Sequence, residues 1–183
     1  MIKQLTEIAD RTYENFATMF PWGFSPFPKN VVFELLYHCN LSCKMCYLRL
    51  EEVQRHLKPK KILDTLEVKK IIDKIPKFVS ISFTGGEPFL RKDIFEILSY
   101  AAAKHRVGVI SNLILLNKAE AEKLLTLNLN SLMFSLDGDE KHNDKIREKG
   151  NFQKTFQFAS FIILEPLVPN EQSLVPAPSG LQF

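Results

Sequence analysis

Strand-like and helix-like stretches alternate along this chain, and that alternation restricts its fold more than any other feature. Short runs rich in β-branched and aromatic residues predict strands at 31–37, 78–84, 106–111 and 131–136. Helical apolar spacing follows these runs, at 47–55, 64–75, 93–104, 118–127 and 151–164. Repeated strand–helix units predict an α/β fold with a parallel sheet and right-handed crossovers.

Three of the predicted helices begin with a residue suited to capping. Asp64 is followed three positions later by Glu67, and Asn117 by Glu120, which is the spacing of a capping box. Asn151 precedes the last helical stretch and is predicted to cap it.

The predicted strands have two unlike faces. Alternate residues of 78–84 are apolar (Val79, Ile81, Phe83) or small and polar (Ser80, Ser82, Thr84). In the fourth strand Leu132, Phe134 and Leu136 alternate with Met133, Ser135 and Asp137. A parallel strand covered by helices on both sides is apolar on both faces. We therefore expect a curved sheet with a ligand-accessible concave side, a partial TIM-type barrel of about four parallel strand–helix units.

The chain divides into three parts. Residues 1–29 are predicted to form an N-terminal helix and a linker rich in proline and glycine. Residues 30–164 hold the repeated units. Residues 165–183 contain four prolines, one glycine and no lysine or arginine, which predicts a poorly ordered tail.

Composition narrows the function classes. The chain of 183 residues has a net charge of +3 and no run of basic residues, which argues against nucleic-acid binding. No stretch reaches the ~18 apolar residues of a membrane span. The N-terminus has neither the cationic start nor the apolar centre of a secretory signal, so we expect a cytoplasmic protein with no membrane partner.

The three cysteines, Cys39, Cys43 and Cys46, lie within eight residues in the spacing C-x3-C-x2-C. That spacing suits a metal or cluster site better than a disulfide framework. Thiolates are soft ligands for zinc, copper(I) or iron–sulfur clusters. Zinc remains an alternative if His38 or His56 supplies a fourth ligand. A [4Fe-4S] cluster held by three thiolates leaves one iron open for a cosubstrate.

Polar segments follow the other three predicted strands. Gly85-Gly86-Glu87-Pro88 follows the second, and its glycines allow close backbone approach to a ligand. Ser111-Asn112 follows the third, and Ser135, Asp137 and Gly138 close the fourth. Taken alone, the first segment is better interpreted as a tight turn with an exposed glutamate, and the second as an ordinary loop. Functional loops of a parallel α/β sheet gather at these strand ends.

The segment 37–47 resembles the signature loop of the radical S-adenosylmethionine (SAM) superfamily, placed as in that family after the first strand. The resemblance implies that Cys39, Cys43 and Cys46 are metal ligands and the catalytic centre. The family has an aromatic residue before the third cysteine. Here Met45 stands there, where a flexible thioether can pack near the adenine.

The other segments resemble SAM-binding motifs of the same family. Gly85, Gly86 and Glu87 match the GGEP motif, which holds the amino group of the SAM methionine moiety. The pair Ser111 and Asn112 matches a position near the ribose and carboxylate.

The stretch around the fourth strand resembles the branch of molybdenum-cofactor synthesis and peptide-modifying (SPASM-type) enzymes. Ser135 and Asp137 lie in its SLDG segment, and Ser135 would reach SAM oxygens. Arg147 would pair with the methionine carboxylate, or else form a surface salt bridge. His142 is interpreted as structural.

The resemblance covers residues 31–156 and implies an enzyme that cleaves SAM reductively to a 5′-deoxyadenosyl radical, which abstracts hydrogen from a small-molecule or peptide substrate. It also implies an electron donor such as flavodoxin or ferredoxin. The family core has six strand–helix units against the four found here, and no cysteine follows Cys46. A truncated, inactive cluster- or SAM-binding module is therefore the alternative, followed by a zinc-binding structural domain.

Overall fold

The computed structural model describes residues 28–51 and 62–164. The predicted N-terminal helix, most of the linker and the tail at 165–183 lie outside the described residues, as does His56.

A four-stranded parallel sheet forms the centre of the molecule. Its strands lie in chain order, β1-β2-β3-β4, which confirms the predicted α/β fold. Their bounds are β1 Asn30–Glu34, β2 Ser80–Thr84, β3 Val107–Ser111 and β4 Ser131–Phe134. Each observed strand is shorter than the predicted one: β1 and β4 end two or three residues early, and β2 and β3 begin one or two residues late.

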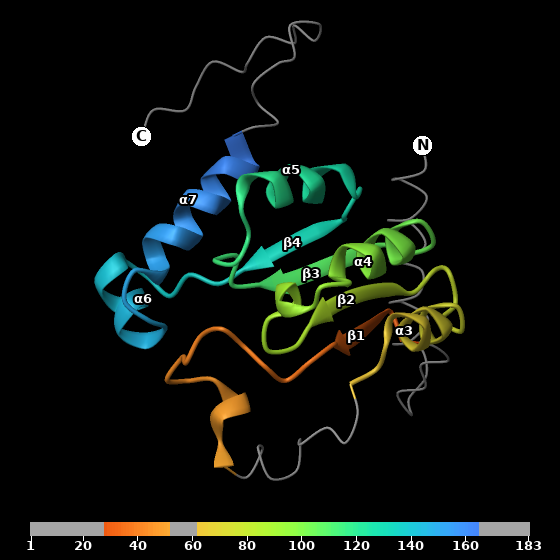
Figure 1. Cartoon of the computed structure of the whole chain (residues 1–183), viewed down its shortest axis with the longest axis horizontal. Coiled ribbons are helices and arrows are strands. Elements are labelled where there is room, and N and C mark those ends of the chain that lie inside the picture. Colours follow the sequence, from red (N-terminus) through yellow and green to blue (C-terminus); the bar gives the residue numbers. More distant parts are fainter. Residues whose placement is uncertain (1–27, 52–61, 165–183) are drawn as a thin grey trace, which may run out of the picture.

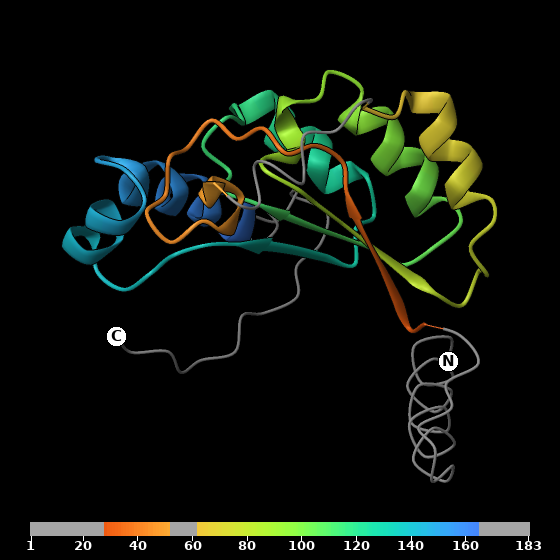
Figure 2. The same cartoon turned by 90° about the horizontal axis from the view of Figure 1, so that it is seen from below.

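Helices connect the strands and gather on one side of the sheet. The α-helices are α3 Thr65–Ile72, α4 Ile94–Ala102, α5 Lys118–Thr126, α6 Glu140–Ile146 and α7 Asn151–Leu164. Figures 1 and 2 show α3, α4 and α5 over the same face, and no described helix covers the opposite face. This one-sided cover is what the two-faced strand pattern predicts for part of a barrel.

Two short 3-10 turns and one helix differ from the sequence expectation. In its described part, the predicted helix at 47–55 consists of a 3-10 turn, Tyr47–Arg49, a bend at Leu50 and a helical residue, Glu51. A second 3-10 turn spans Pro88–Leu90. Helix α6 was not predicted, because the run EKHNDKI contains a single apolar residue and shows no apolar stripe.

The core lies between the sheet and its helix layer. Ile81, Phe83, Val107 and Val109 are fully buried there against helix residues such as Ile97. The serines of β2 are only partly buried, on the other face. The predicted alternation is therefore confirmed for β2, whereas β4 lies at the sheet edge and exposes both Met133 and Phe134.

Two predicted helix caps are confirmed and one is wrong. Complete capping boxes join Asp64 to Glu67 and Asn117 to Glu120. At α7, however, the Asn151 side-chain oxygen accepts from the side-chain amide of Asn143 and does not cap the helix. The Asp144 carboxylate takes the cap role by accepting from the amide of Phe152 at 2.9 Å and from that of Gly150.

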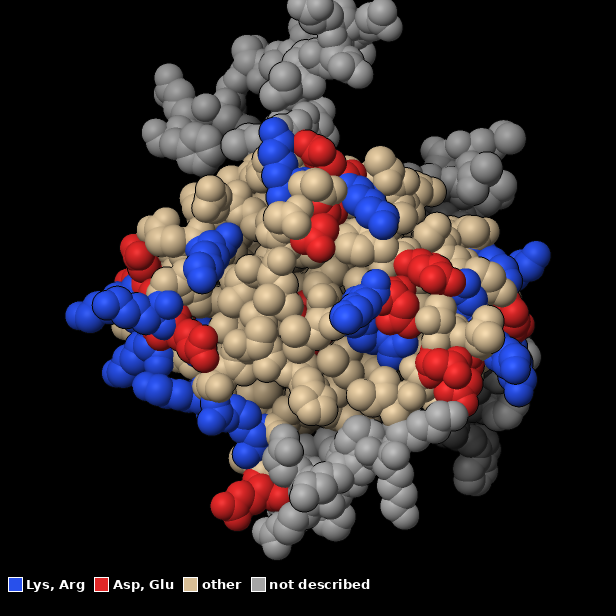
Figure 3. Space-filling view, viewed as in Figure 1, with Lys and Arg blue, Asp and Glu red and all other residues tan. Residues whose placement is uncertain are grey.

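The surface carries both signs of charge. Figure 3 shows acidic and basic side chains interspersed around a neutral centre on the face seen in Figure 1. Within residues 28–51 and 62–164, no helix has the length and apolar character needed to cross a membrane.

Candidate functional site

All four segments singled out in the sequence follow the carboxyl ends of strands. The cysteine loop follows β1, the Gly85-Gly86 turn follows β2, Ser111-Asn112 ends β3, and the Ser135–Asp137 stretch follows β4. Parallel strands bring these ends to one edge of the sheet (Figure 1).

The glycine turn lies directly against the chain that leads into the cysteine loop. The Gly86 amide donates to the Leu36 carbonyl at 2.7 Å, and the Glu87 amide to the His38 carbonyl at 2.9 Å. A Cβ atom on Gly86 would lie 2.0 Å from the His38 oxygen. Gly85 has φ +138° and would place a Cβ 2.4 Å from the Leu36 oxygen. Both glycines are therefore required for this close approach.

The carboxylate of Glu87 is buried at the junction of β2 and β3. Glu87 is 1% exposed, and its oxygens accept from the Ser111 hydroxyl at 2.8 Å, the Asn112 amide at 2.8 Å and the Phe89 amide at 3.1 Å. Burial raises the pKa of this carboxyl above its ordinary value, and the three hydrogen bonds act against that shift. Glu87 thus fixes the two strand ends to each other.

Asn112 extends this junction to the cysteine loop. Its side-chain amide donates to the Asn40 oxygen at 2.9 Å and lies 3.7 Å from the Cys39 sulfur. Its backbone carbonyl accepts from the Thr155 hydroxyl of α7 at 3.1 Å. One residue at the end of β3 therefore contacts both the first cysteine and the last helix.

The other side of the cysteine loop is attached to the end of α6. The Lys44 amide donates to the Ile146 carbonyl at 2.9 Å, and the Ser42 amide to the Glu148 carboxylate at 3.0 Å. Arg147, between these two contacts, forms an ion pair with Asp137.

The stretch after β4 is held by buried amides. The Asn143 side chain accepts from the Asp137 amide at 3.0 Å and donates to the Asn151 oxygen at 2.9 Å. Both asparagines are buried. The Asn151 side-chain nitrogen is buried without a hydrogen-bond partner in the described structure.

The three thiols are free and differ in exposure. Cys39 is exposed, Cys46 partly buried and Cys43 buried. Partial desolvation by the surrounding protein raises the pKa of the Cys39 and Cys43 thiols, and the positive charge of Arg147 opposes that rise at Cys43. The negative charge of neighbouring thiolates adds to the rise, so the thiols influence one another electrostatically.

Among the described residues, no three His, Cys, Asp or Glu side chains already converge as a metal site. The donor set nevertheless fits a [4Fe-4S] cluster, because it offers three soft thiolates on one loop and Glu87 is engaged by protein donors.

The structure brings most of the predicted site residues together. Glu87, Ser111 and Asn112 form one connected group with the cysteine loop, and Asp137 pairs with Arg147 on its other side. Met45 is 52% exposed, and Ser135 is partly buried. Sequence reasoning missed Asn40, Glu148 and Thr155, whose contacts join residues far apart in the chain. It also missed Asn143, whose partners lie six and eight positions away.

Comparison with known proteins assigns the family. The sequence model of the radical SAM superfamily matches residues 33–160. The chain belongs to the radical SAM superfamily. Proteins of this family are enzymes that use a [4Fe-4S] cluster and SAM, and some of the relatives belong to the predicted SPASM-type branch.

Three relatives illustrate the likeness. The chain is 39% identical over 126 residues to the Fe-coproporphyrin III synthase of Methanosarcina barkeri, a match that covers 67% of this chain and 31% of that protein. It is 33% identical over 130 residues to the mycofactocin maturase MftC of Mycolicibacterium smegmatis, covering 68% and 32%. It is 30% identical over 162 residues to the subtilosin biosynthesis protein AlbA of Bacillus subtilis, covering 84% and 34%.

Solved structures share the fold. SuiB of Streptococcus suis superposes with a TM-score of 0.61 and 23% identity, covering 74% of this chain and 30% of that one. A structure of anSMEcpe with bound AdoMet gives 0.57 and 20%, covering 77% and 41%. The chain thus spans about a third of the length of the curated relatives described here.

Proposed function

We propose that this chain binds a [4Fe-4S] cluster through Cys39, Cys43 and Cys46, binds SAM beside it, and takes part in the reductive cleavage of SAM. The observation that carries the proposal is the direct attachment of the cysteine loop to the glycine turn and to Asn112. The segments expected to hold the cluster and the cosubstrate are therefore one hydrogen-bonded unit.

Cys39, Cys43 and Cys46 would hold the cluster, which would supply the one electron for cleavage of SAM to methionine and a 5′-deoxyadenosyl radical, the group that would take a hydrogen atom from the substrate. The protein binds and orients these groups and excludes competing reactions. Its three cysteines must lose their protons on binding, because thiolates are the ligands.

The proposed SAM contacts divide between two sides of the cysteine loop. On one side, Gly85 and Gly86 offer backbone groups at close range, with Ser111 and Asn112 beside them. Glu87 contributes through the backbone that it fixes, because both its oxygens already accept from protein donors.

On the other side, Ser135 and Arg147 are proposed to reach SAM oxygens, and Asp137 orients the Arg147 guanidinium. Met45, on the cysteine loop, is exposed and is proposed to pack against the adenine.

We propose a small molecule or a peptide as substrate, because the relatives include both a porphyrin synthase and a subtilosin biosynthesis protein. A flavodoxin or ferredoxin is the proposed donor. The free cysteines of the described residues suit a reducing compartment such as the cytoplasm.

A second candidate is a module that binds cluster and SAM without turnover. The sheet of the described residues ends at β4, which exposes Met133 and Phe134 and leaves the strand unpaired on its outer side. Such an edge accepts a further strand.

Anaerobic reconstitution separates these candidates. The protein is loaded with iron and sulfide, reduced with dithionite and given SAM, with Cys43→Ala as the control. Formation of 5′-deoxyadenosine and methionine in the wild type alone supports the enzyme. A brown protein that leaves SAM intact supports the binding module. A colourless protein with stoichiometric zinc contradicts both.

A further inference from the structure

The segment that carries all three cysteines leaves the sheet after β1 and returns at α3. It runs from Leu35 to Leu63, and both of these end residues contact the same side chain, Arg91. Arg91 follows the 3-10 turn Pro88–Leu90, so its position is set by the chain that continues from the Gly85-Gly86 turn.

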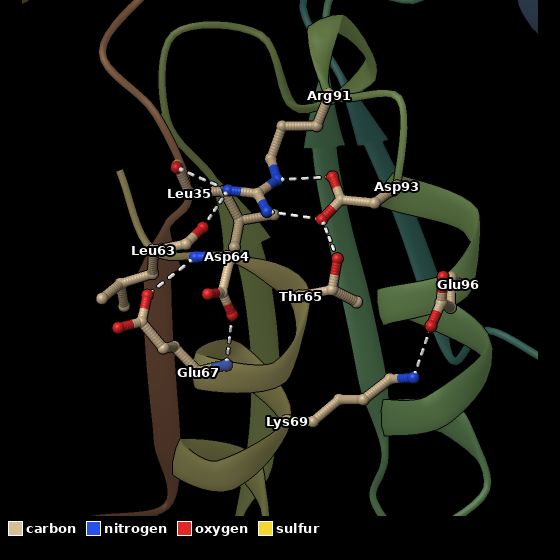
Figure 4. A network of polar contacts seen from close by, with 9 residues as sticks. All are labelled: Leu35, Leu63, Asp64, Thr65, Glu67, Lys69, Arg91, Asp93 and Glu96. Atoms are coloured by element: carbon tan, nitrogen blue, oxygen red, sulfur yellow. Dashed lines mark hydrogen bonds and ion pairs between the residues drawn. The ribbon is translucent and has the colours of Figure 1, made fainter. Parts of the chain in front are cut away.

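The guanidinium of Arg91 joins the two ends of the segment. Its Nη1 atom donates to the Leu63 carbonyl at 3.0 Å and to the Leu35 carbonyl at 3.5 Å (Figure 4). The Arg91 side chain is only 8% exposed. Backbone carbonyls at the two ends of a 29-residue segment, 35–63, are thus held by one nearly buried cation.

Asp93 fixes the orientation of that guanidinium. Its oxygens accept from the Arg91 Nε atom at 2.9 Å and the Nη2 atom at 2.6 Å, a bidentate pair. The same carboxylate accepts from the Thr65 hydroxyl, the first residue of α3, at 2.6 Å. The Arg91 guanidinium is therefore held between the starts of α3 and α4.

We propose that Arg91 is a positioning residue that closes the base of the cysteine-bearing segment and so presents the three thiols beside the glycine turn. The inference extends the proposed function, because it concerns how the cluster ligands are placed. Only a planar group with several fixed donors can hold Asp93 and two carbonyls together, so lysine cannot replace it.

The structure offers a matched control nearby. Lys69 of α3 and Glu96 of α4 form an ion pair at 2.6 Å that joins the same two helices (Figure 4). Among the described residues, this pair forms no hydrogen bond with Leu35 or Leu63. Lys69→Met therefore removes an ion pair between α3 and α4 and leaves the contacts of Arg91 with the two ends of the segment 35–63 in place.

The test compares wild type with R91K, D93N and K69M. In the metal-free protein, the rate at which iodoacetamide alkylates the buried Cys43 is followed by peptide mass spectrometry at one pH. In reconstituted protein, the rate of cluster loss to a chelator is followed by absorbance. Thermal unfolding of each variant is recorded beside both.

We expect R91K to speed Cys43 alkylation and cluster loss about tenfold, the factor for losing one charge-assisted hydrogen bond in a local opening. D93N should also speed Cys43 alkylation and cluster loss, but by a smaller factor. If R91K does not fold, the rates of D93N test the positioning role. K69M should match the wild type in both rates.

Alkylation rates of R91K and D93N within twofold of wild type would overturn the proposal. Suppose that neither the wild type nor any variant takes up a cluster, but Cys43 is still alkylated faster in R91K and D93N than in the wild type and K69M. The positioning role of Arg91 then stands, and the proposed function fails. If every variant binds the cluster and alkylates alike, the positioning role fails alone.

Discussion

Glu148 accepts a hydrogen bond from the Ser42 amide at 3.0 Å, although the two residues lie 106 positions apart. Beside it, the Ile146 carbonyl accepts from the Lys44 amide at 2.9 Å. The middle of the cysteine loop is thus attached to the end of α6, while its beginning is attached to the glycine turn. Protein hydrogen bonds therefore hold the loop on two sides.

This contact predicts a difference between two variants of Glu148. Glu148→Ala removes the acceptor, so hydrogen exchange of the Ser42 amide should speed up about fivefold, as expected for losing about 1 kcal/mol. Glu148→Gln keeps an acceptor oxygen and should exchange nearly as slowly as the wild type. Exchange is measured on the metal-free protein by NMR. Equal rates in Ala and Gln variants would show that this hydrogen bond does not restrain the loop.

Gly86 should tolerate no side chain. Gly86→Ala places a Cβ 2.0 Å from the backbone oxygen of His38, whereas a Cβ on Gly150 meets nothing within 4 Å. Gly150→Ala therefore costs only its backbone strain at φ +80°, about 1–2 kcal/mol. Denaturant unfolding should show a distinctly larger loss for Gly86→Ala. Similar losses in the two variants would contradict the close approach of the glycine turn.

Glu87→Gln should destabilise the protein even though it removes a buried charge. All three groups that contact the carboxylate are donors, so the amide nitrogen of glutamine would face a donor and leave it unsatisfied. The expected loss is about 1–3 kcal/mol in the free energy of unfolding. Ser111→Ala, which removes a single donor, should cost less. A glutamine variant as stable as the wild type would indicate that the carboxyl is protonated in the folded protein.

The cap of α7 should make stability depend on acidic pH. Hydrogen bonds from the Phe152 and Gly150 amides lower the pKa of Asp144. A folded-state pKa below the unfolded value stabilises the protein above the unfolded pKa, and this stabilisation is lost as pH falls through the folded pKa. The stability difference between wild type and Asp144→Asn should therefore shrink below about pH 4. Unfolding curves from pH 7 to pH 3 check this, and a constant difference would contradict it.

Local patterns predicted much of this structure. Capping boxes depend on residues three positions apart, so Asp64 with Glu67 and Asn117 with Glu120 were identifiable from the sequence. Side chains alternate between the two faces of a strand, and this alternation in the sequence correctly predicted that Ile81 and Phe83 lie in the core. The order of elements then put the polar segments at one edge of the sheet.

Contacts between distant segments were not predictable in the same way. Nothing near Arg91 in the sequence indicates that it joins Leu35 to Leu63, and Glu148 reads as an ordinary surface charge. The position of Glu87 at a strand end was expected, but its burial depends on Ser111, the last residue of β3, and on Asn112, which follows it. Asn151 was expected to cap α7, yet Asp144 competes more strongly for the free amides because it carries a charge.

The strand order also determines how the site assembles during folding. No neighbouring strands are joined by a hairpin: paired residues are 23 positions apart between Gly108 and Ser131, 26 between Ile81 and Val107, and 50 between Asn30 and Ser80. Closing the longest loop costs the most chain entropy, so β1 should join the sheet after β2, β3 and β4 have paired. The cysteines lie within that longest loop. We therefore expect them to meet the glycine turn late in folding, when β2, β3 and β4 are already paired.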